Sequence, residues 1–414
     1  MGLIHYLDQI SMKTRSILAA IAIILGATLI SSCGNVTRNT DNKAKYIFLF
    51  IGDGMGNSHV ATAESYLSYK QGKLGGEHLK MTSFPYYGTA STYSANRQVT
   101  CSSAAGTAIA CGQKTKNGML GMGPDSLALK SVAYELKEQG YKIGILSTVP
   151  INHATPASFY AHNINRSNYY EIASEIPASE FDYFAASGFL AYNGKDGDKE
   201  PIDEYLEENG CIVCYGLKEF SEEKENSKTV VLCPIAADGK NVGNYTVEGQ
   251  EEEDLRLSQM LEAGIEFLGD DKPFFFMCEG GDIDWAAHAN KTMSMVMNIL
   301  EFDEAIQTAY EFYLKHPDET LIIVTADHET GGLSLGSTSK SIDWEMLEKS
   351  WIDNGRKPLE DKTANKELND KCSFGWTTKS HTGAQVPVFA IGCGAERFMG
   401  RFDNTDIKGK ILCR

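Results

Sequence analysis

Five short apolar runs, rich in β-branched and aromatic residues, recur along the chain, and helical patterns lie between several of them. The runs are Tyr46 to Ile51, Lys142 to Thr148, Pro273 to Cys278, Leu321 to Thr325 and Val386 to Ile391. One helical pattern carries apolar residues three or four positions apart from Val296 to Tyr313, and another ends at Gly140. Strands that alternate with helices form a largely parallel sheet with helices on both faces. The sequence therefore predicts an α/β fold, with a doubly wound central sheet in one large domain.

The N-terminus shows an export pattern that precedes the first predicted strand. Basic residues are followed by an apolar run from Ile17 to Ile30, and then by small residues and Cys33. The run is shorter than the roughly 20 residues of a membrane-spanning helix, so a signal peptide is favoured over a single membrane span. The sequence around Cys33 resembles a bacterial lipobox, in which the cysteine is lipidated and becomes the first residue of the mature protein.

These features divide the chain into three parts. Residues 1–33 are interpreted as a lipoprotein signal peptide, residues 34–45 as a flexible polar tether and residues 46–414 as the globular domain. Two polar and irregular stretches of the domain, 193–250 and 333–379, are predicted to be insertions around the rim of its site. A lipid anchor places the protein at a bacterial membrane, facing the periplasm or, alternatively, exported to the cell surface.

Reactive side chains follow directly after several of the predicted strands. Asp53 follows the first run, Glu279 the third, and Asp327 and His328 the fourth. Ligand sites in open α/β sheets lie beyond the carboxyl ends of the strands, so these side chains are expected at one site. The formal net charge of −17 disfavours nucleic acid as a partner, because the protein would repel a polyanion. Cations and small substrates are the expected partners.

Two of the segments contain residues that suit metal ions. Asp284 and His288 stand four residues apart and share one face if the chain turns into a helix there. With His381 as the candidate third ligand, they would form an open catalytic zinc site. On its own, such a pair most often lies on an exposed face of a helix. The other segments with potential ligands make metal binding the favoured interpretation here.

A second cation site is predicted where Asp327 and His328 end a buried strand. Asp53 can join them, because the glycines around it permit a tight turn and a close backbone approach. Asp53 with Thr155 and Glu279 also offers the hard oxygen ligands that suit magnesium. The alternatives are a turn carboxylate for Asp53 and a helix-capping pair for the other two residues.

Ser102 is the candidate nucleophile. The β-favouring pair Val99-Thr100 precedes it and small helix-forming residues follow, which predicts a helix N-terminus at Ser102, a position that favours an alkoxide and a phosphate. A hydroxyl needs a base or a metal for activation, and the cation held by Asp327 and His328 would supply it. The alternative is an N-cap serine. Arg166 can bind two phosphate oxygens with its guanidinium fork, or be an exposed helix residue.

Taken together, these motifs resemble the alkaline phosphatase family, and they occur in the family's order over about residues 46 to 395. They are Gly52-Asp-Gly-Met-Gly, Val99-Thr-Cys-Ser102, His153-Ala-Thr-Pro, Glu279-Gly-Gly-Asp-Ile-Asp284, Thr325-Ala-Asp-His and His381-Thr-Gly. The resemblance implies a phosphate monoester hydrolase that forms a phosphoserine on Ser102, with Arg166 on the phosphoryl group. Members are often dimeric, so a homodimer is one assembly that it allows.

The resemblance also implies two zinc ions and one magnesium ion, with a ligand set for each. One zinc is assigned to Asp284, His288 and His381; the other zinc to Asp53, Asp327 and His328; and the magnesium to Asp53, Thr155 and Glu279.

Three positions near this implied site vary among family members. Many members have aspartate where this chain has Cys101, so the support of Arg166 is expected to be weaker or to come from elsewhere. His153 and Trp285 are expected near the magnesium and the phosphate, where they would tune rate and metal preference.

Two alternatives to a phosphate monoester hydrolase are kept. One is another enzyme of the same superfamily, a phosphodiesterase or a sulfatase. Thr155, Glu279 and Arg166 favour monoesters, and the sulfatase pattern is missing around Cys101. The other alternative is a non-catalytic lipoprotein that binds metal or phosphate, which would be expected to have lost a ligand or the nucleophile.

Overall fold

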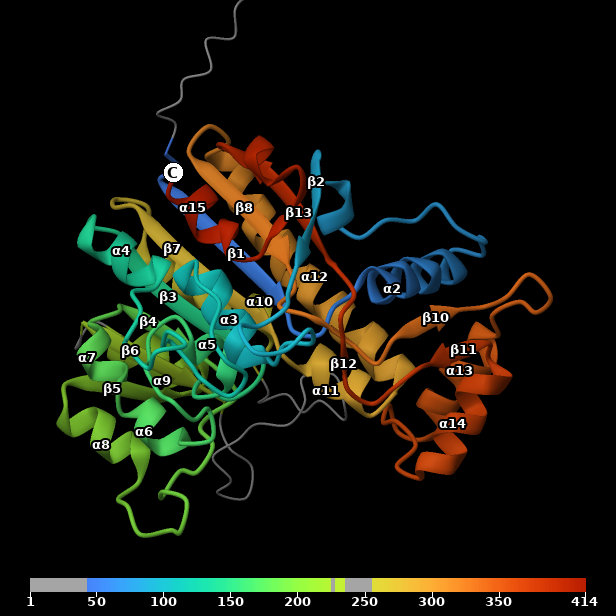
Figure 1. Cartoon of the computed structure of the whole chain (residues 1–414), viewed down its shortest axis with the longest axis horizontal. Coiled ribbons are helices and arrows are strands. Elements are labelled where there is room, and N and C mark those ends of the chain that lie inside the picture. The colour runs from blue at the N-terminus through green and yellow to red at the C-terminus, as the bar shows by residue number, and fades with distance from the viewer. Residues whose placement is uncertain (1–42, 225–227, 235–254) are drawn as a thin grey trace, which may run out of the picture. The chain divides into compact units, whose positions relative to one another are not determined.

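A sheet of ten strands forms the centre of the protein (Figure 1). The computed structural model describes residues 43–224, 228–234 and 255–414, so the predicted signal peptide, the lipidated Cys33 and most of the tether lie outside the described residues. In sheet order the strands are β14 (Gly400–Asp403), β2 (Tyr86–Ser91), β13 (Val386–Gly392), β8 (Thr320–Thr325), β1 (Tyr46–Gly52), β7 (Phe274–Gly280), β3 (Lys142–Ser147), β4 (Tyr183–Ala185), β6 (Thr229–Cys233) and β5 (Cys211–Tyr215).

The strand directions confirm the predicted fold class. Within the sheet β13 alone runs against its neighbours, pairing antiparallel with β8 and β2, and the remaining pairings are parallel. All five strands predicted from the sequence are present, as β1, β3, β7, β8 and β13, and all five lie in this sheet. Central strands such as β1 and β7 are buried along their whole length, which is why they appear in the sequence as continuous apolar runs.

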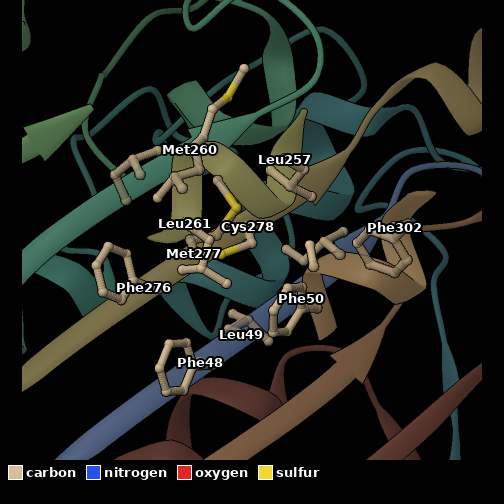
Figure 2. Close-up of a cluster of buried hydrophobic side chains, with 14 of the residues drawn as sticks. Phe48, Leu49, Phe50, Leu257, Met260, Leu261, Phe276, Met277, Cys278 and Phe302 are labelled. Carbon is tan, nitrogen blue, oxygen red and sulfur yellow. The ribbon is translucent and has the colours of Figure 1, made fainter. Parts of the chain in front are cut away.

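Successive side chains of a strand point to opposite sides of the sheet. Both faces of the central strands are apolar, and helices cover both of them. In β7 the rings of Phe274 and Phe276 face α12 and β1, with the Phe274 ring 5.3 Å from Phe312, whereas Phe275 contacts Phe159 on the other face. Figure 2 shows the first of these layers, where Phe48 lies beside Phe276 and Phe50 beside Phe302. The sheet is therefore the middle layer of three.

Several of the described helices pack in two groups, one around α12 and one around α3. Helices α2, α10 and α11 pack against α12, whereas α4, α5 and α15 pack against α3. The helices are α2 (Asn57–Lys70), α3 (Ser102–Cys111), α4 (Val132–Glu138), α5 (Ala154–Ala157), α6 (Tyr169–Ala173), α7 (Ile176–Ser179), α8 (Ile202–Glu208), α9 (Gly216–Glu223), α10 (Leu257–Leu268), α11 (Asp282–His288), α12 (Thr292–Lys315), α13 (Trp344–Asp353), α14 (Lys362–Lys371) and α15 (Asp406–Ile411), with 3-10 turns at Met81–Ser83 and Ala395–Phe398. Within the described ranges, none of these helices has the length and apolar character needed to cross a bilayer.

One of the two predicted insertions needs correction. The described part of segment 193–250 contains α8, β5, α9 and β6, and its two strands complete the central sheet at one edge. The short apolar run of β6 pairs with β4 and that of β5 pairs with β6, so this segment extends the core. Residues 235–250 lie outside the described residues.

Segment 333–379 has a different place in the fold. It forms the antiparallel pair β10 (Leu333–Leu335) and β11 (Phe374–Trp376) together with α13 and α14, outside the ten-stranded sheet. The short pair β9 (Glu329–Thr330) and β12 (His381–Thr382) flanks it on either side in sequence. Through this pairing, the two ends of the segment are held next to the carboxyl end of β8.

Candidate metal and phosphate site

Three strands bring carboxylates to one edge of the sheet, because their carboxyl ends are adjacent there. β1 lies between β7 and β8, and Ile51 pairs with both Glu279 and Thr325. Asp53 therefore follows β1 next to Glu279, and Asp327 follows β8. All three carboxylates are completely buried. The structure thus brings together these predicted residues, at the strand ends where the sequence placed them.

The turn after Asp53 needs a glycine. Gly54 has a φ of +73°, and a Cβ atom there would lie 2.9 Å from both Asp284 Oδ1 and Thr330 Oγ1. Its backbone N–H donates to Asp327 Oδ1 at 3.2 Å. A larger residue would push the turn away from these groups, so Gly54 allows the end of β1 to pack directly against the site.

The first group of ligand residues is Asp284, His288 and His381. Asp284 and His288 lie one turn apart in α11, and the Nε2 atoms of His288 and His381 are 3.1 Å apart. His288 Nδ1 lies 2.7 Å from the Lys379 carbonyl and His381 Nδ1 lies 2.9 Å from the Thr100 carbonyl. Carbonyl oxygens only accept, so both histidines carry a proton on Nδ1. Two Nε2 lone pairs and a carboxylate therefore converge, which is the arrangement of a cation site.

The second group surrounds His328. Its Nε2 atom lies 3.3 Å from Asp53 Oδ1 and 3.1 Å from Asp327 Oδ2, and all three side chains are completely buried. Asp284 is also close enough to Asp53 and His328 to share one cation with them. The predicted set of Asp53, Asp327 and His328 is thus assembled, and Asp284 lies between the first and second groups.

The third group contains a residue that was not predicted as a ligand. Asp53, His153 and Glu279 offer ligand atoms within 4.8 Å of one another, whereas the sequence placed His153 only in the neighbourhood. Thr155, the predicted ligand, donates to Asp53 Oδ2 at 3.4 Å. Ser147 donates to Glu279 Oε2. The carboxylate and hydroxyl oxygens of this group suit magnesium, and the His153 ring lies beside them.

Several buried polar atoms of the second and third groups are unsatisfied in the described part of the chain. Four buried atoms have no hydrogen-bond partner among the described residues: Asp53 Oδ1, His153 Nδ1, Glu279 Oε1 and Asp327 Oδ2. Burial, reinforced by repulsion from neighbouring carboxylates, raises the pKa of Asp53 well above its usual range, that of Glu279 to about 8 and that of Asp327 to about 7. Bound cations would satisfy the three carboxylate oxygens and remove the repulsion between the carboxylates. The residues therefore fit the metal ions that the sequence implied.

Ser102 is the first residue of α3, as predicted. Small residues let this helix pack closely, and a Cβ at Gly106 would lie 2.5 Å from the Ser158 Oγ atom just after α5. The Ser102 hydroxyl is buried, and its Oγ lies 3.2 Å from His328 Nε2. The nucleophile candidate is thus at a helix N-terminus and in contact with a ligand of the second group.

Arg166 is tied to the site through His153. Its Nη2 donates to His153 Nε2 at 2.9 Å, and the His153 ring makes an edge-to-face contact with Trp285 at 5.7 Å. The backbone N–H of Arg166 donates to the Gly118 carbonyl, and the Gly118 N–H donates to Cys101 Sγ at 3.2 Å. Arg166 thus gains side-chain support from His153, while Cys101 anchors the loop that binds the backbone of Arg166.

Two residues of the site were missed in the sequence. Thr330 contacts members of both the first and second groups, and Glu329 accepts hydrogen bonds from the Gly332 N–H at 2.9 Å and from the Thr382 hydroxyl. Glu329 thereby holds the strand that carries His381. The available signal was their position, because both residues directly follow the Asp-His pair at the end of β8.

Comparisons with known proteins agree with this geometry. The family model described as alkaline phosphatase matches residues 44–187 and 184–413. Alkaline phosphatase 4 of Bacillus subtilis (strain 168) is 31% identical, with 87% of this chain and 86% of that protein covered.

Solved structures give the same result. The alkaline phosphatase from the Antarctic bacterium TAB5 is 33% identical, with a TM-score of 0.72 and coverage of 89% of this chain and 97% of that one. A mutant of that enzyme, with a TM-score of 0.73 and 32% identity, has Mg bound in its M3 site. A cold-active alkaline phosphatase from the psychrophile Shewanella sp. is 26% identical, with a TM-score of 0.77 and coverage of 89% and 98%. By its sequence, its fold and its groups of ligand residues, this chain belongs to the alkaline phosphatase family of enzymes.

Proposed function

We propose that this protein hydrolyses phosphate monoesters through a phosphoserine at Ser102. The observation that carries the proposal is the Ser102 hydroxyl at the start of α3, 3.2 Å from His328 Nε2 and beside the buried carboxylates. A helix N-terminus stabilises both the ionised hydroxyl and a phosphate bonded to it. The arrangement is suited to phosphoryl transfer, in which positioning and charge stabilisation supply most of the catalysis.

The proposed cations are two zinc ions and one magnesium ion. One zinc would be held by Asp284, His288 and His381; the other by Asp53, Asp327 and His328; and the magnesium by Asp53, Thr155 and Glu279. When bound, these ions would neutralise phosphoryl charge and lower the pKa of hydroxyl and water ligands.

The proposed reaction has two displacement steps, the formation of the phosphoserine and its hydrolysis. In the first, Ser102 gives up its hydroxyl proton as Oγ attacks phosphorus, the bond from phosphorus to the ester oxygen breaks, and the alcohol leaves after taking up a proton. In the second, water attacks the phosphoserine, inorganic phosphate leaves and the Ser102 hydroxyl is restored. The guanidinium of Arg166 would hold two of the phosphoryl oxygens, in the orientation set by its hydrogen bond to His153.

A comparison of substrates tests this function. We expect kcat/KM at mildly alkaline pH to be much larger for an aryl phosphate monoester than for the matching diester. The activity should vanish with a chelator and return with zinc and magnesium. A preference for the diester would instead assign the protein to the phosphodiesterases of the superfamily, and absence of metal-dependent turnover would favour a binding lipoprotein.

For the N-terminus, we propose lipidation at Cys33 and attachment to the periplasmic side of a bacterial membrane. The support is the apolar run that ends in small residues and Cys33. Replacement of Cys33 by Ser is expected to move the protein from the membrane fraction of its host to another fraction and to abolish labelling with radioactive palmitate. Unchanged labelling in this variant would contradict the assignment.

A further inference from the structure

Thr330 lies between the first two groups of ligand residues. It is completely buried in β9, two residues after His328. Its Oγ1 atom is 2.6 Å from Asp284 Oδ1, in the first group, and 3.2 Å from His328 Nδ1, in the second. A single hydroxyl therefore touches one ligand of each proposed zinc ion.

The hydroxyl of Thr330, the carboxylate of Asp284 and the imidazole of His328 together fix the direction of both hydrogen bonds. A carboxylate only accepts, so the single hydroxyl hydrogen of Thr330 is donated to Asp284. Its oxygen then offers a lone pair to His328, so His328 donates from Nδ1 and keeps the lone pair on Nε2. That Nε2 atom faces Asp53 Oδ1 at 3.3 Å, Asp327 Oδ2 at 3.1 Å and Ser102 Oγ at 3.2 Å.

His328 differs in this respect from the other two histidines. His288 and His381 donate from Nδ1 to backbone carbonyls, which cannot act as donors. A hydroxyl can donate or accept, and Thr330 accepts from His328 only because it donates to Asp284. The nitrogen on which His328, in the second group, carries its proton thus depends on Asp284, in the first group.

We propose that Thr330 is a positioning residue that sets which nitrogen His328 presents and couples the two zinc groups. The inference rests on the ligand assignment proposed above. In metal sites the partner of the second ring nitrogen orients a histidine ligand, and its loss typically lowers metal affinity 10-fold to 100-fold. Here one hydroxyl would have this effect on two ions.

The surrounding backbone holds Thr330 in place. Its N–H donates to the Gly54 carbonyl at 3.0 Å, and it pairs with His381 across the β9–β12 ribbon. The two hydrogen bonds need only a hydroxyl at this position, so serine is expected to make them as threonine does. Valine has the same shape but leaves Asp284 Oδ1 and His328 Nδ1 without this partner.

The test is the rate of zinc release to a chromogenic chelator from the purified, zinc-loaded protein. Thr330→Val is expected to release both zinc ions about 10-fold faster or more than the wild type, whereas Thr330→Ser should remain close to it. Thr320→Val is the matched control, since Thr320 is buried at the opposite end of β8 and its hydroxyl has no partner among the described residues.

The outcomes separate this inference from the proposed function. Unchanged release in Thr330→Val, or faster release of only one ion, would overturn the coupling while leaving the wild-type zinc content and turnover intact. Equal acceleration in Thr330→Ser and Thr330→Val would also overturn it, because the effect would then come from packing. A wild type that binds no zinc would instead contradict the ligand assignment itself.

Discussion

Replacement of Ser102 by alanine is expected to lower phosphate monoester turnover by on the order of 10³-fold or more, as removal of a nucleophile does in other hydrolases. The Ser102 hydroxyl is the one that begins α3 and contacts His328. Without it, neither the phosphoserine nor its hydrolysis can occur. The measurement is kcat for an aryl phosphate, together with trapping of radioactive phosphate on the protein at acid pH.

Ser103 supplies the matched control for this prediction. It is buried in the same helix turn, but its hydroxyl lies 3.2 Å from Cys101 Sγ, which does not belong to any of the three ligand groups. Ser103→Ala should retain most of the turnover and still trap phosphate at Ser102. Near-normal turnover in Ser102→Ala, or trapped phosphate at Ser103, would show that the wrong hydroxyl has been assigned.

The sequence predicted the parts of this fold whose signals are local. β1 and β7 are buried on both faces and therefore form continuous apolar runs that end in Asp53 and Glu279. The helix start at Ser102 and the helical face of Asp284 and His288 were likewise predictable, because small residues and a four-residue spacing are visible in the chain.

Features that depend on distant contacts were not predictable in this way. β5 and β6 are only five residues long and lie in a polar segment, so their place in the sheet follows from the pairing of β6 with β4 and of β5 with β6. Thr330 looks like an ordinary strand threonine until the fold brings Asp284 against it. The contact of Arg166 with His153 likewise joins residues whose partnership the spacing alone does not specify.

The contact between Arg166 and His153 bears on the departure at Cys101. A family aspartate at that position would be a charged partner for Arg166, and the cysteine cannot take that role. In this protein, His153 accepts from the guanidinium, and burial, with the nearby charge of Arg166, lowers the pKa of His153 to about 3. The imidazole is therefore neutral and able to accept. Arg166 is thus linked through His153 to Asp53 and Glu279 of the third group.

Removal of the metal ions is expected to make the stability of the protein depend strongly on pH. The carboxyl groups of Asp327 and Glu279 have pKa values raised from 3.8 and 4.5 to about 7 and about 8, chiefly by burial. These two carboxyl groups therefore hold more protons in the folded, metal-free protein than in the unfolded chain between about pH 4 and pH 8. Buried His59 and His153, with pKa values lowered to about 4 and about 3, have the opposite effect, but only below the pKa of an unfolded histidine, about 6.5. The contribution of the two acids to the free energy of unfolding must fall as pH rises through this window, and above about pH 6.5 no lowered histidine opposes it. One pKa unit corresponds to about 1.4 kcal/mol, so the total fall is on the order of several kcal/mol.

Bound cations reverse this effect, because they take the place of the protons on the same oxygen atoms. Thermal unfolding of stripped and reloaded protein between pH 5 and pH 8 should therefore show a gap in Tm that widens as pH rises. Burial also raises the pKa of Glu301 to about 7 and that of Asp303 to about 6. These two acids lie on α12 outside the ligand groups, so they affect both forms equally and cancel in the difference.

Two variants make the test specific to the ligand carboxylates. Asp327→Asn should stabilise the stripped protein at pH 8, because it removes one buried acid, and should weaken the stabilisation by metal. The Glu304→Gln variant alters an exposed acid of α12 and should leave the gap unchanged. If the Tm values of stripped and reloaded wild type changed in parallel with pH, the carboxylates of Asp327 and Glu279 could not be exchanging protons for cations. The ligand assignment would then have to be abandoned, because a cation held by other residues would leave the two acids protonated in both forms.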